Sequence, residues 1–139
     1  MKKVLLSLVV VFLSVAAFAQ QKEPAQVAAV GPKITFEEVE YNFGDIAQGD
    51  KVEYKFVFKN EGTAPLVLSN VLTTCGCTAP SWPREPIAPG QTSEINVVFN
   101  SAGKRGPQNK TITVISNAVN ENEKVRLIGN VLPPKTDSK

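Results

Sequence analysis

The sequence predicts an all-β domain, built as a sandwich of two antiparallel sheets, and three observations lead to this prediction. Apolar residues recur at every second position along most of the chain after residue 33, which is the period of strands with one buried face. No stretch of that region repeats apolar residues at helical spacing. Turn-forming residues separate the alternating segments at intervals of about ten residues. About seven strands without a helix are typical of the immunoglobulin-like fold.

The first nineteen residues are expected to be a signal peptide that is removed on export. A basic start leads into an apolar run, and Ala17 and Ala19 supply the small residues for cleavage between Ala19 and Gln20. Cleavage leaves 120 of the 139 residues, enough for one domain. No second long apolar run follows, so we expect a periplasmic or secreted product without a membrane anchor.

Two segments flank the predicted domain, which spans residues 33–132. Residues 20–32 contain two prolines and no periodicity, so they are expected to form a flexible spacer. Residues 133–139 begin with two prolines, which separate a polar tail from the last strand.

Charge and composition argue against several classes of function. Without Lys2 and Lys3, thirteen basic residues face thirteen acidic ones, so the exported chain carries no net charge. Nucleic-acid binding therefore lacks its main electrostatic support. The chain has no histidine, which excludes histidine general bases, serine–histidine triads and histidine-ligated metals. We therefore expect a protein that is not an enzyme.

Four segments alternate regularly and are predicted to be strands with one solvent-exposed face: 51–59, 94–99, 111–115 and 124–131. In the first of these, apolar residues such as Tyr54 and Phe56 alternate with residues that are almost all charged. Strands of this kind belong to antiparallel sheets.

The alternation changes phase at two places. The first change lies between residues 34–36 and 39–43, which predicts a bulge or kink at Glu37–Glu38. In a sandwich, such a kink lets one strand pass from one sheet to the other. The second change requires one extra residue near Ser69–Asn70.

The segment from Trp82 to Gly90 contains three prolines and cannot be a central strand. We expect it to cross between the two sheets, with Pro89–Gly90 at the centre of a type II turn. Trp82 has two interpretations. An aromatic residue between prolines can form a binding surface for a partner peptide, but it more often closes one end of the core, and we favour that role.

Several motifs together resemble a known family. They include Tyr41-Asn42-Phe43-Gly44-Asp45-Ile46, Cys75-Gly76-Cys77-Thr78-x-Pro80-x-Trp82 and Pro86-Ile87-x-Pro89-Gly90. From Ile34 to Val131, the sequence resembles the bacterial domain of unknown function 1573 family, whose members are similar to immunoglobulin-like domains of the major sperm protein and Hydin type. The resemblance implies an exported seven-stranded sandwich with no established activity. The motif from Cys75 to Trp82 is its specific part.

The Cys75-Gly76-Cys77 motif is the chemically unusual feature and has three interpretations. In a flat strand, residues i and i+2 lie about 6.6 Å apart on one face, at the upper end of what a disulfide can bridge. Gly76 would let the backbone contract, so a tight disulfide could form in an oxidising compartment. Two thiolates could instead hold Cu(I). We favour a pair of reduced cysteines packed where a strand meets the proline-rich segment.

The sequence thus favours a non-catalytic module without a cofactor, which binds proteins or has a structural role in the bacterial envelope. Its partners are expected to be proteins, docked at edge strands or at end loops. The alternative is a thiol redox or Cu(I)-handling protein that uses Cys75 and Cys77. Lys104-Arg105, with Lys110 nearby, is interpreted as a solvated hairpin tip rather than an anion site.

Overall fold

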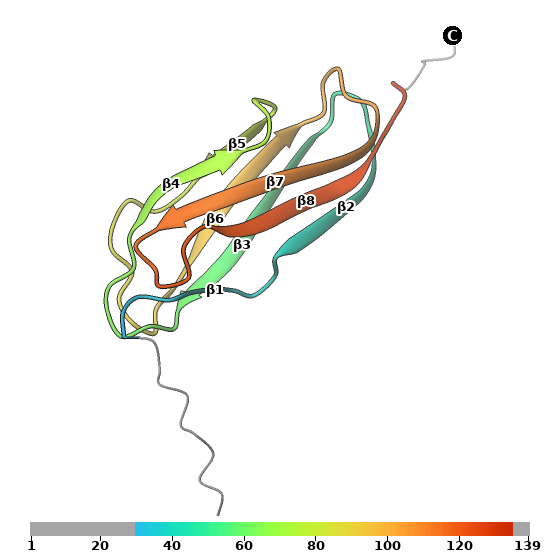
Figure 1. Ribbon diagram of the computed structural model, residues 1–139. Coiled ribbons are helices and arrows are strands. Elements are labelled where there is room, and N and C mark those ends of the chain that lie inside the picture. The colour runs from blue at the N-terminus through green and yellow to red at the C-terminus, as the bar shows by residue number, and fades with distance from the viewer. Residues whose placement is uncertain (1–29, 135–139) are drawn as a thin grey trace, which may run out of the picture.

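The computed structural model describes residues 30–134, and within this range it contains strands but no helix. The strands are β1 (Ile34–Phe36), β2 (Glu40–Ala47), β3 (Lys51–Asn60), β4 (Leu68–Thr73), β5 (Thr78–Ser81), β6 (Thr92–Asn100), β7 (Gly106–Ser116) and β8 (Glu123–Leu132). They form two four-stranded sheets, ordered β1-β3-β6-β5 and β2-β8-β7-β4 (Figure 1). The all-β sandwich is confirmed, with eight strands instead of seven. The expected cleavage site at Ala19 and Gln20 lies outside the described residues.

The chain changes sheets between β1 and β2, which confirms the kink predicted at Glu37–Glu38. β1 pairs with β3 in one sheet, and β2 pairs with β8 in the other. The second pairing is parallel, so the expectation of wholly antiparallel sheets was wrong at this edge. The reason is that the chain keeps its direction as it passes into the second sheet, where β8 runs the same way (Figure 1).

Two further local predictions are confirmed. The register of β4 against β7 shifts between Leu68 and Asn70, where the sequence requires an extra residue. At the predicted type II turn, Gly90 has a φ of 81°, and the Gln91 N–H donates to the Ala88 carbonyl at 3.0 Å. A positive φ at this position favours glycine.

The core fills the space between the sheets. Phe56 and Phe58 of β3 and Phe99 of β6 are completely buried. Each large apolar side chain contributes about 1.5–3 kcal/mol when it is buried. The same core contains thirteen further buried apolar residues: Ile34, Leu66, Leu68, Val71, Ile87, Ile95, Val97, Ile112, Val114, Ala118, Val125, Leu127 and Val131.

The proline-rich segment from Trp82 to Gly90 joins β5 to β6, which are neighbours in one sheet, so the prediction that it crosses between sheets is wrong. The reason is that β5 precedes this segment and already pairs with β6. The sequence did not predict β5 because it contains Pro80, but an edge strand tolerates a proline. The proline-rich segment also pairs with the residues just before β4. Ile87 of the segment and Leu66 exchange two backbone hydrogen bonds of 2.8 Å.

Candidate functional site

A disulfide joins Cys75 and Cys77 across the turn between β4 and β5. The interpretation of the two cysteines as a reduced, packed pair is therefore wrong, since neither thiol is free. Their Cα atoms lie 5.3 Å apart, closer than the roughly 6.6 Å of a flat strand. The cysteines lie in a turn and not in a strand, which brings them within the ordinary range of a disulfide.

Hydrogen bonds within the turn bring its two ends together. The turn does not depend on the conformational freedom of Gly76. Gly76 does not adopt a left-handed φ, and a Cβ placed on it would meet no atom within 4 Å. The Cys75 carbonyl accepts hydrogen bonds from the Thr78 N–H at 3.3 Å and from Thr73 Oγ1 at 3.0 Å. These bonds draw the ends of β4 and β5 together, and the disulfide spans the turn between them.

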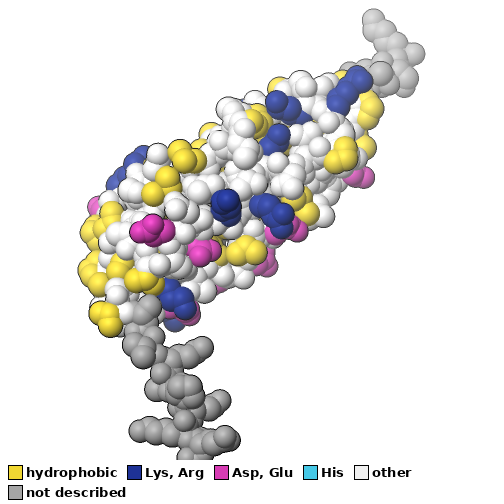
Figure 2. All heavy atoms as spheres, viewed as in Figure 1, with side chains coloured by type: hydrophobic (Ala, Val, Ile, Leu, Met, Phe, Trp, Pro, Cys, Tyr) yellow, Lys and Arg dark blue, Asp and Glu magenta, His cyan; other side chains and the backbone are white. Residues whose placement is uncertain are grey.

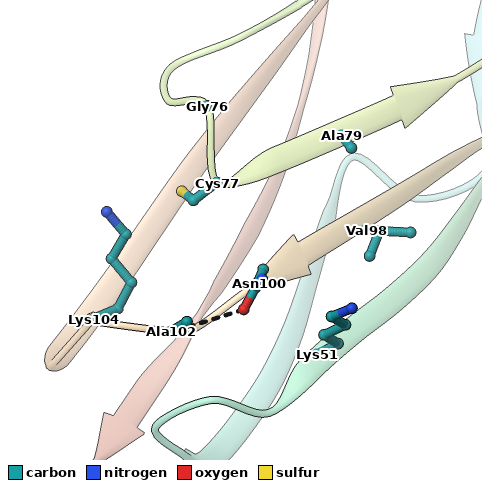
Figure 3. A pocket seen from close by; sticks show the side chains of 8 residues that line it. All are labelled: Lys51, Gly76, Cys77, Ala79, Val98, Asn100, Ala102 and Lys104. Carbon is teal, nitrogen blue, oxygen red and sulfur yellow. Dashed lines mark hydrogen bonds between the residues drawn. The ribbon is translucent and has the colours of Figure 1, made fainter.

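A surface hollow of about 440 Å³ opens beside this turn (Figure 3). Its charged lining residues are both lysines: Lys51 begins β3, and Lys104 lies in the loop between β6 and β7. The other residues that line it are Gly76, Cys77, Ala79, Val98, Asn100 and Ala102. The wall therefore combines small apolar side chains with the polar Asn100, between two positive charges.

The acidic residue next along the outer face of β3 does not line the hollow. Glu53 accepts a hydrogen bond of 2.7 Å from Asn96 Nδ2. Its carboxylate is thereby directed to the neighbouring β6 residue, and the hollow keeps its positive character. Figure 2 shows several Lys and Arg side chains near the end of the sandwich where the β6–β7 loop lies.

Two of the three basic residues that the sequence placed at a solvated hairpin tip are partly buried. Lys104 lines the hollow, and Lys110 places its Nζ atom 5.6 Å from the centroid of the Phe99 ring. Burial lowers the pKa of Lys110 below its ordinary value, and the positive charge of Lys104 lowers it further. Arg105 is exposed, as expected of a solvated tip, whereas Lys104 and Lys110 are partly buried.

Trp82 follows the end of β5, whereas the disulfide precedes its start. The two ends of the motif from Cys75 to Trp82 therefore lie in different parts of the domain. The indole is partly buried and packs against the core, as the end-closing interpretation expects. Its outer face is covered by Arg84, whose Cζ lies 3.9 Å from the ring centroid. The Nε1 atom is buried without a hydrogen-bond partner in the described part of the chain. Trp82 takes no part in the hollow.

On both edge strands of the first sheet, some outward backbone groups are occupied or absent. At β1, Asn120 bonds both backbone groups of Ile34: its Oδ1 accepts from the N–H at 3.2 Å and its Nδ2 donates to the carbonyl at 2.7 Å. At β5, Pro80 has no N–H, and the Thr78 N–H is used inside the disulfide turn. Such features keep a second chain from extending a sheet.

Side chains also occupy backbone N–H groups on the edge strands of the second sheet. In β2, the Gly44 N–H donates to Asn42 Oδ1 at 2.8 Å, and the Ala47 N–H donates to Asp50 Oδ2 at 3.1 Å. In β4, the Val71 N–H donates to Asn70 Oδ1 at 2.9 Å. Both strands also contain an irregularity of register. Bulges and occupied donors disfavour pairing with another strand.

Within residues 30–134, no three His, Cys, Asp or Glu side chains lie together as metal ligands, and no helix is long and apolar enough to cross a membrane. Cu(I) prefers thiolate ligands. Cys75 and Cys77 could supply thiolates only after their disulfide is reduced, and the Cu(I) hypothesis therefore requires a change of redox state first.

Solved structures share this fold at low sequence identity. A protein of unknown function from Porphyromonas gingivalis has a TM-score of 0.64 and 18% identity, over 78% of this chain and 51% of that one. A PapD-like (ASH) domain of human CEP192 has a TM-score of 0.60 and 13% identity, over 74% of this chain and 87% of that one. The secreted serine protease VesC from Vibrio cholerae has a TM-score of 0.56 and 14% identity, over 72% of this chain and 23% of that one.

These likenesses concern the fold alone, and this chain spans about half of the Porphyromonas gingivalis protein. By sequence, no curated protein matches this chain. Residues 34–131, which include all but the last residue of the eight strands, do match the family described as protein of unknown function (DUF1573). The resemblance seen in the sequence is thereby confirmed, and the chain is a member of the DUF1573 family with an immunoglobulin-like, PapD-like sandwich fold.

Proposed function

We propose that this protein is an exported, non-catalytic module that binds a protein partner at the end of its sandwich beside the Cys75–Cys77 disulfide. The proposal rests on a contrast between the edge strands and the hollow at the end of the sandwich. Each of the four edge strands has at least one outward backbone N–H that is capped or absent, whereas the hollow lined by Lys51 and Lys104 is open. Of the two docking modes that the sequence left open, the end of the sandwich is therefore the better supported.

The partner is an extended segment rich in acidic residues. Lys51 and Lys104 attract carboxylates, while Ala79, Val98 and Ala102 between them offer apolar contact. A volume of about 440 Å³ suits a few residues of a peptide. Charge complementarity of this kind chiefly increases the association rate and selects the partner.

Export is supported by the basic and apolar N-terminal segment that ends at Ala19, and by the disulfide. Disulfides persist in oxidising compartments such as the periplasm and are rare in the cytosol. N-terminal sequencing of the protein recovered from the periplasm should begin at Gln20. Recovery of a chain that still begins at Met1 in the soluble cytosolic fraction would contradict export.

A peptide titration tests the binding. The probes are two six-residue peptides, one of alternating glutamate and leucine and one of alternating lysine and leucine. The acidic peptide should bind more tightly, and Lys51→Gln with Lys104→Gln should weaken it about tenfold, since each exposed charge pair contributes modestly. Lys59→Gln is the matched control, because Lys59 lies on the same face of β3, about 26 Å from Lys51. Equal binding of both peptides, or equal loss in the control, would contradict the proposal.

A further inference from the structure

The Cys75–Cys77 disulfide closes a very short loop and contributes little to the stability of the fold. The stabilisation that a disulfide gives by restricting the unfolded chain increases with loop length. Here only one residue separates the two cysteines. The domain already has a contiguous core of sixteen buried apolar residues, and both cysteines lie outside its fully buried part. The bond therefore has a local role.

The disulfide is within reach of solvent. Both cysteines are only partly buried, and the residue between them, Gly76, is exposed. Cys77 lines the hollow, and its side chain is drawn there beside Lys104 in Figure 3. Exposed disulfides are more often labile and open to exchange than enclosed structural ones.

The hollow beside Cys77 contains groups that can stabilise a thiolate. Lys51 and Lys104 line the same hollow as Cys77. The Thr78 hydroxyl lies 3.9 Å from the sulfurs of both cysteines and can donate to a thiolate. Neighbouring positive charge lowers the pKa of a thiol, and a thiol of lower pKa leaves faster in exchange.

From these features we propose that Cys75–Cys77 is a thiol-exchange site, at which the disulfide accepts two electrons from a protein dithiol. The exchange does not require that a peptide bind in the hollow. A thiolate of the dithiol attacks Cys75 Sγ, the bond between the cysteines breaks, and its electron pair leaves on Cys77 Sγ. The second thiolate of the dithiol then attacks the mixed disulfide and releases Cys75. The dithiol is oxidised to a disulfide, and its two protons pass, through solvent, to the two cysteines.

The test uses the exported chain under native conditions at neutral pH, with dithiothreitol as the dithiol and alkylation followed by intact-mass measurement as the readout. We expect two alkylated cysteines while the circular dichroism of the folded domain is retained. Lys51→Gln with Lys104→Gln should slow the reduction about two- to fivefold, because the lysines stabilise the leaving thiolate and attract the reactive thiolate form of the reagent. Added salt should slow the wild type more than this variant.

Lys59→Gln is again the control and should leave the rate unchanged. Two results would overturn the proposal. In the first, the cysteines become alkylated only at denaturant concentrations that unfold the domain, so the bond is structural. In the second, the double variant and Lys59→Gln are reduced at the same rate, so the lysines have no part in the exchange. Neither result depends on whether an acidic peptide binds.

Discussion

Asn120 takes both backbone hydrogen-bonding groups of Ile34, although 86 residues separate the two in the chain. A side-chain amide, with a donor and an acceptor, thus occupies the place that a neighbouring strand would take beside β1. The contact has two effects. It satisfies the polar groups of a residue whose side chain is buried in the core, and it occupies those groups at one edge of the first sheet.

Asn120→Ala should lower the free energy of unfolding by about 1–3 kcal/mol, because the N–H and carbonyl of Ile34 lose their partners. Denaturant unfolding monitored by circular dichroism measures the change. Asn109→Ala, at an exposed position of β7, is the matched control and should change stability by less than about 0.5 kcal/mol. Equal effects of the two substitutions would show that the cap at β1 contributes nothing.

Phe56→Ala should cost about 3–5 kcal/mol, because the ring is completely buried and its loss leaves a cavity between two sheets that cannot close on it. Its neighbour Lys55 faces solvent and forms an exposed ion pair with Glu94, with an N–O distance of 2.6 Å. Lys55→Ala should cost about 0.5 kcal/mol or less. Thermal and denaturant unfolding compare the two, and a larger effect for Lys55 would mean that the register of β3 is wrong.

Substitution by alanine should destabilise the domain at Gly129 but be tolerated at Gly76. A Cβ at position 129 would overlap the ring of Phe43, so Gly129→Ala should destabilise the domain by about 1–3 kcal/mol. At Gly76 a Cβ meets no atom within 4 Å, so Gly76→Ala should fold with its disulfide intact. Unfolding curves and thiol titration measure the two outcomes. A free thiol in folded Gly76→Ala would show that the turn does require glycine.

Tyr54 should make stability fall at alkaline pH. Its hydroxyl donates to Glu38 Oε2 at 2.7 Å, and this hydrogen bond, helped by burial and by the charge of Glu38, raises the pKa of Tyr54 above 10.0. The folded state therefore holds the proton at pH values where the unfolded state has lost it. The contribution is complete below pH 10 and is lost as the pH rises through the folded-state pKa.

Unfolding at a series of pH values, with Tyr54→Phe as the comparison, measures this contribution. The variant lacks the ionising hydroxyl but keeps the ring that stacks on Tyr41 at a centroid distance of 3.8 Å. Wild type should lose stability relative to the variant above pH 10. A constant difference between the two proteins across that range would refute the linkage.

Local patterns in the sequence predicted much of the fold. Period-two alternation marked β3, β6, β7 and β8, because a side-chain period of two decides which face is buried. The change of phase at Glu37–Glu38 marked the passage between sheets, because one extra residue exchanges the buried and exposed faces. The parallel partner of β2 could not be predicted, because pairing between distant strands leaves no local signal.

The site was less predictable than the fold. The spacing of Cys75 and Cys77 was compatible with three chemistries, and only the path of the turn selects the disulfide. The hollow combines the start of β3, the end of β6, the disulfide turn and the β6–β7 loop. No sequence pattern connects Lys51 to Lys104, since their proximity arises from the pairing of β3 with β6.

The central claim, that partners dock at the end of the sandwich and not along its edges, is tested most directly by nuclear magnetic resonance. Amide shifts of the labelled domain should be followed during titration with the glutamate–leucine peptide. We predict that the shifts concentrate at Lys51, Ala79, Asn100, Ala102 and Lys104, which line the hollow. Shifts concentrated instead along the edge strands β2 or β4 would contradict this claim.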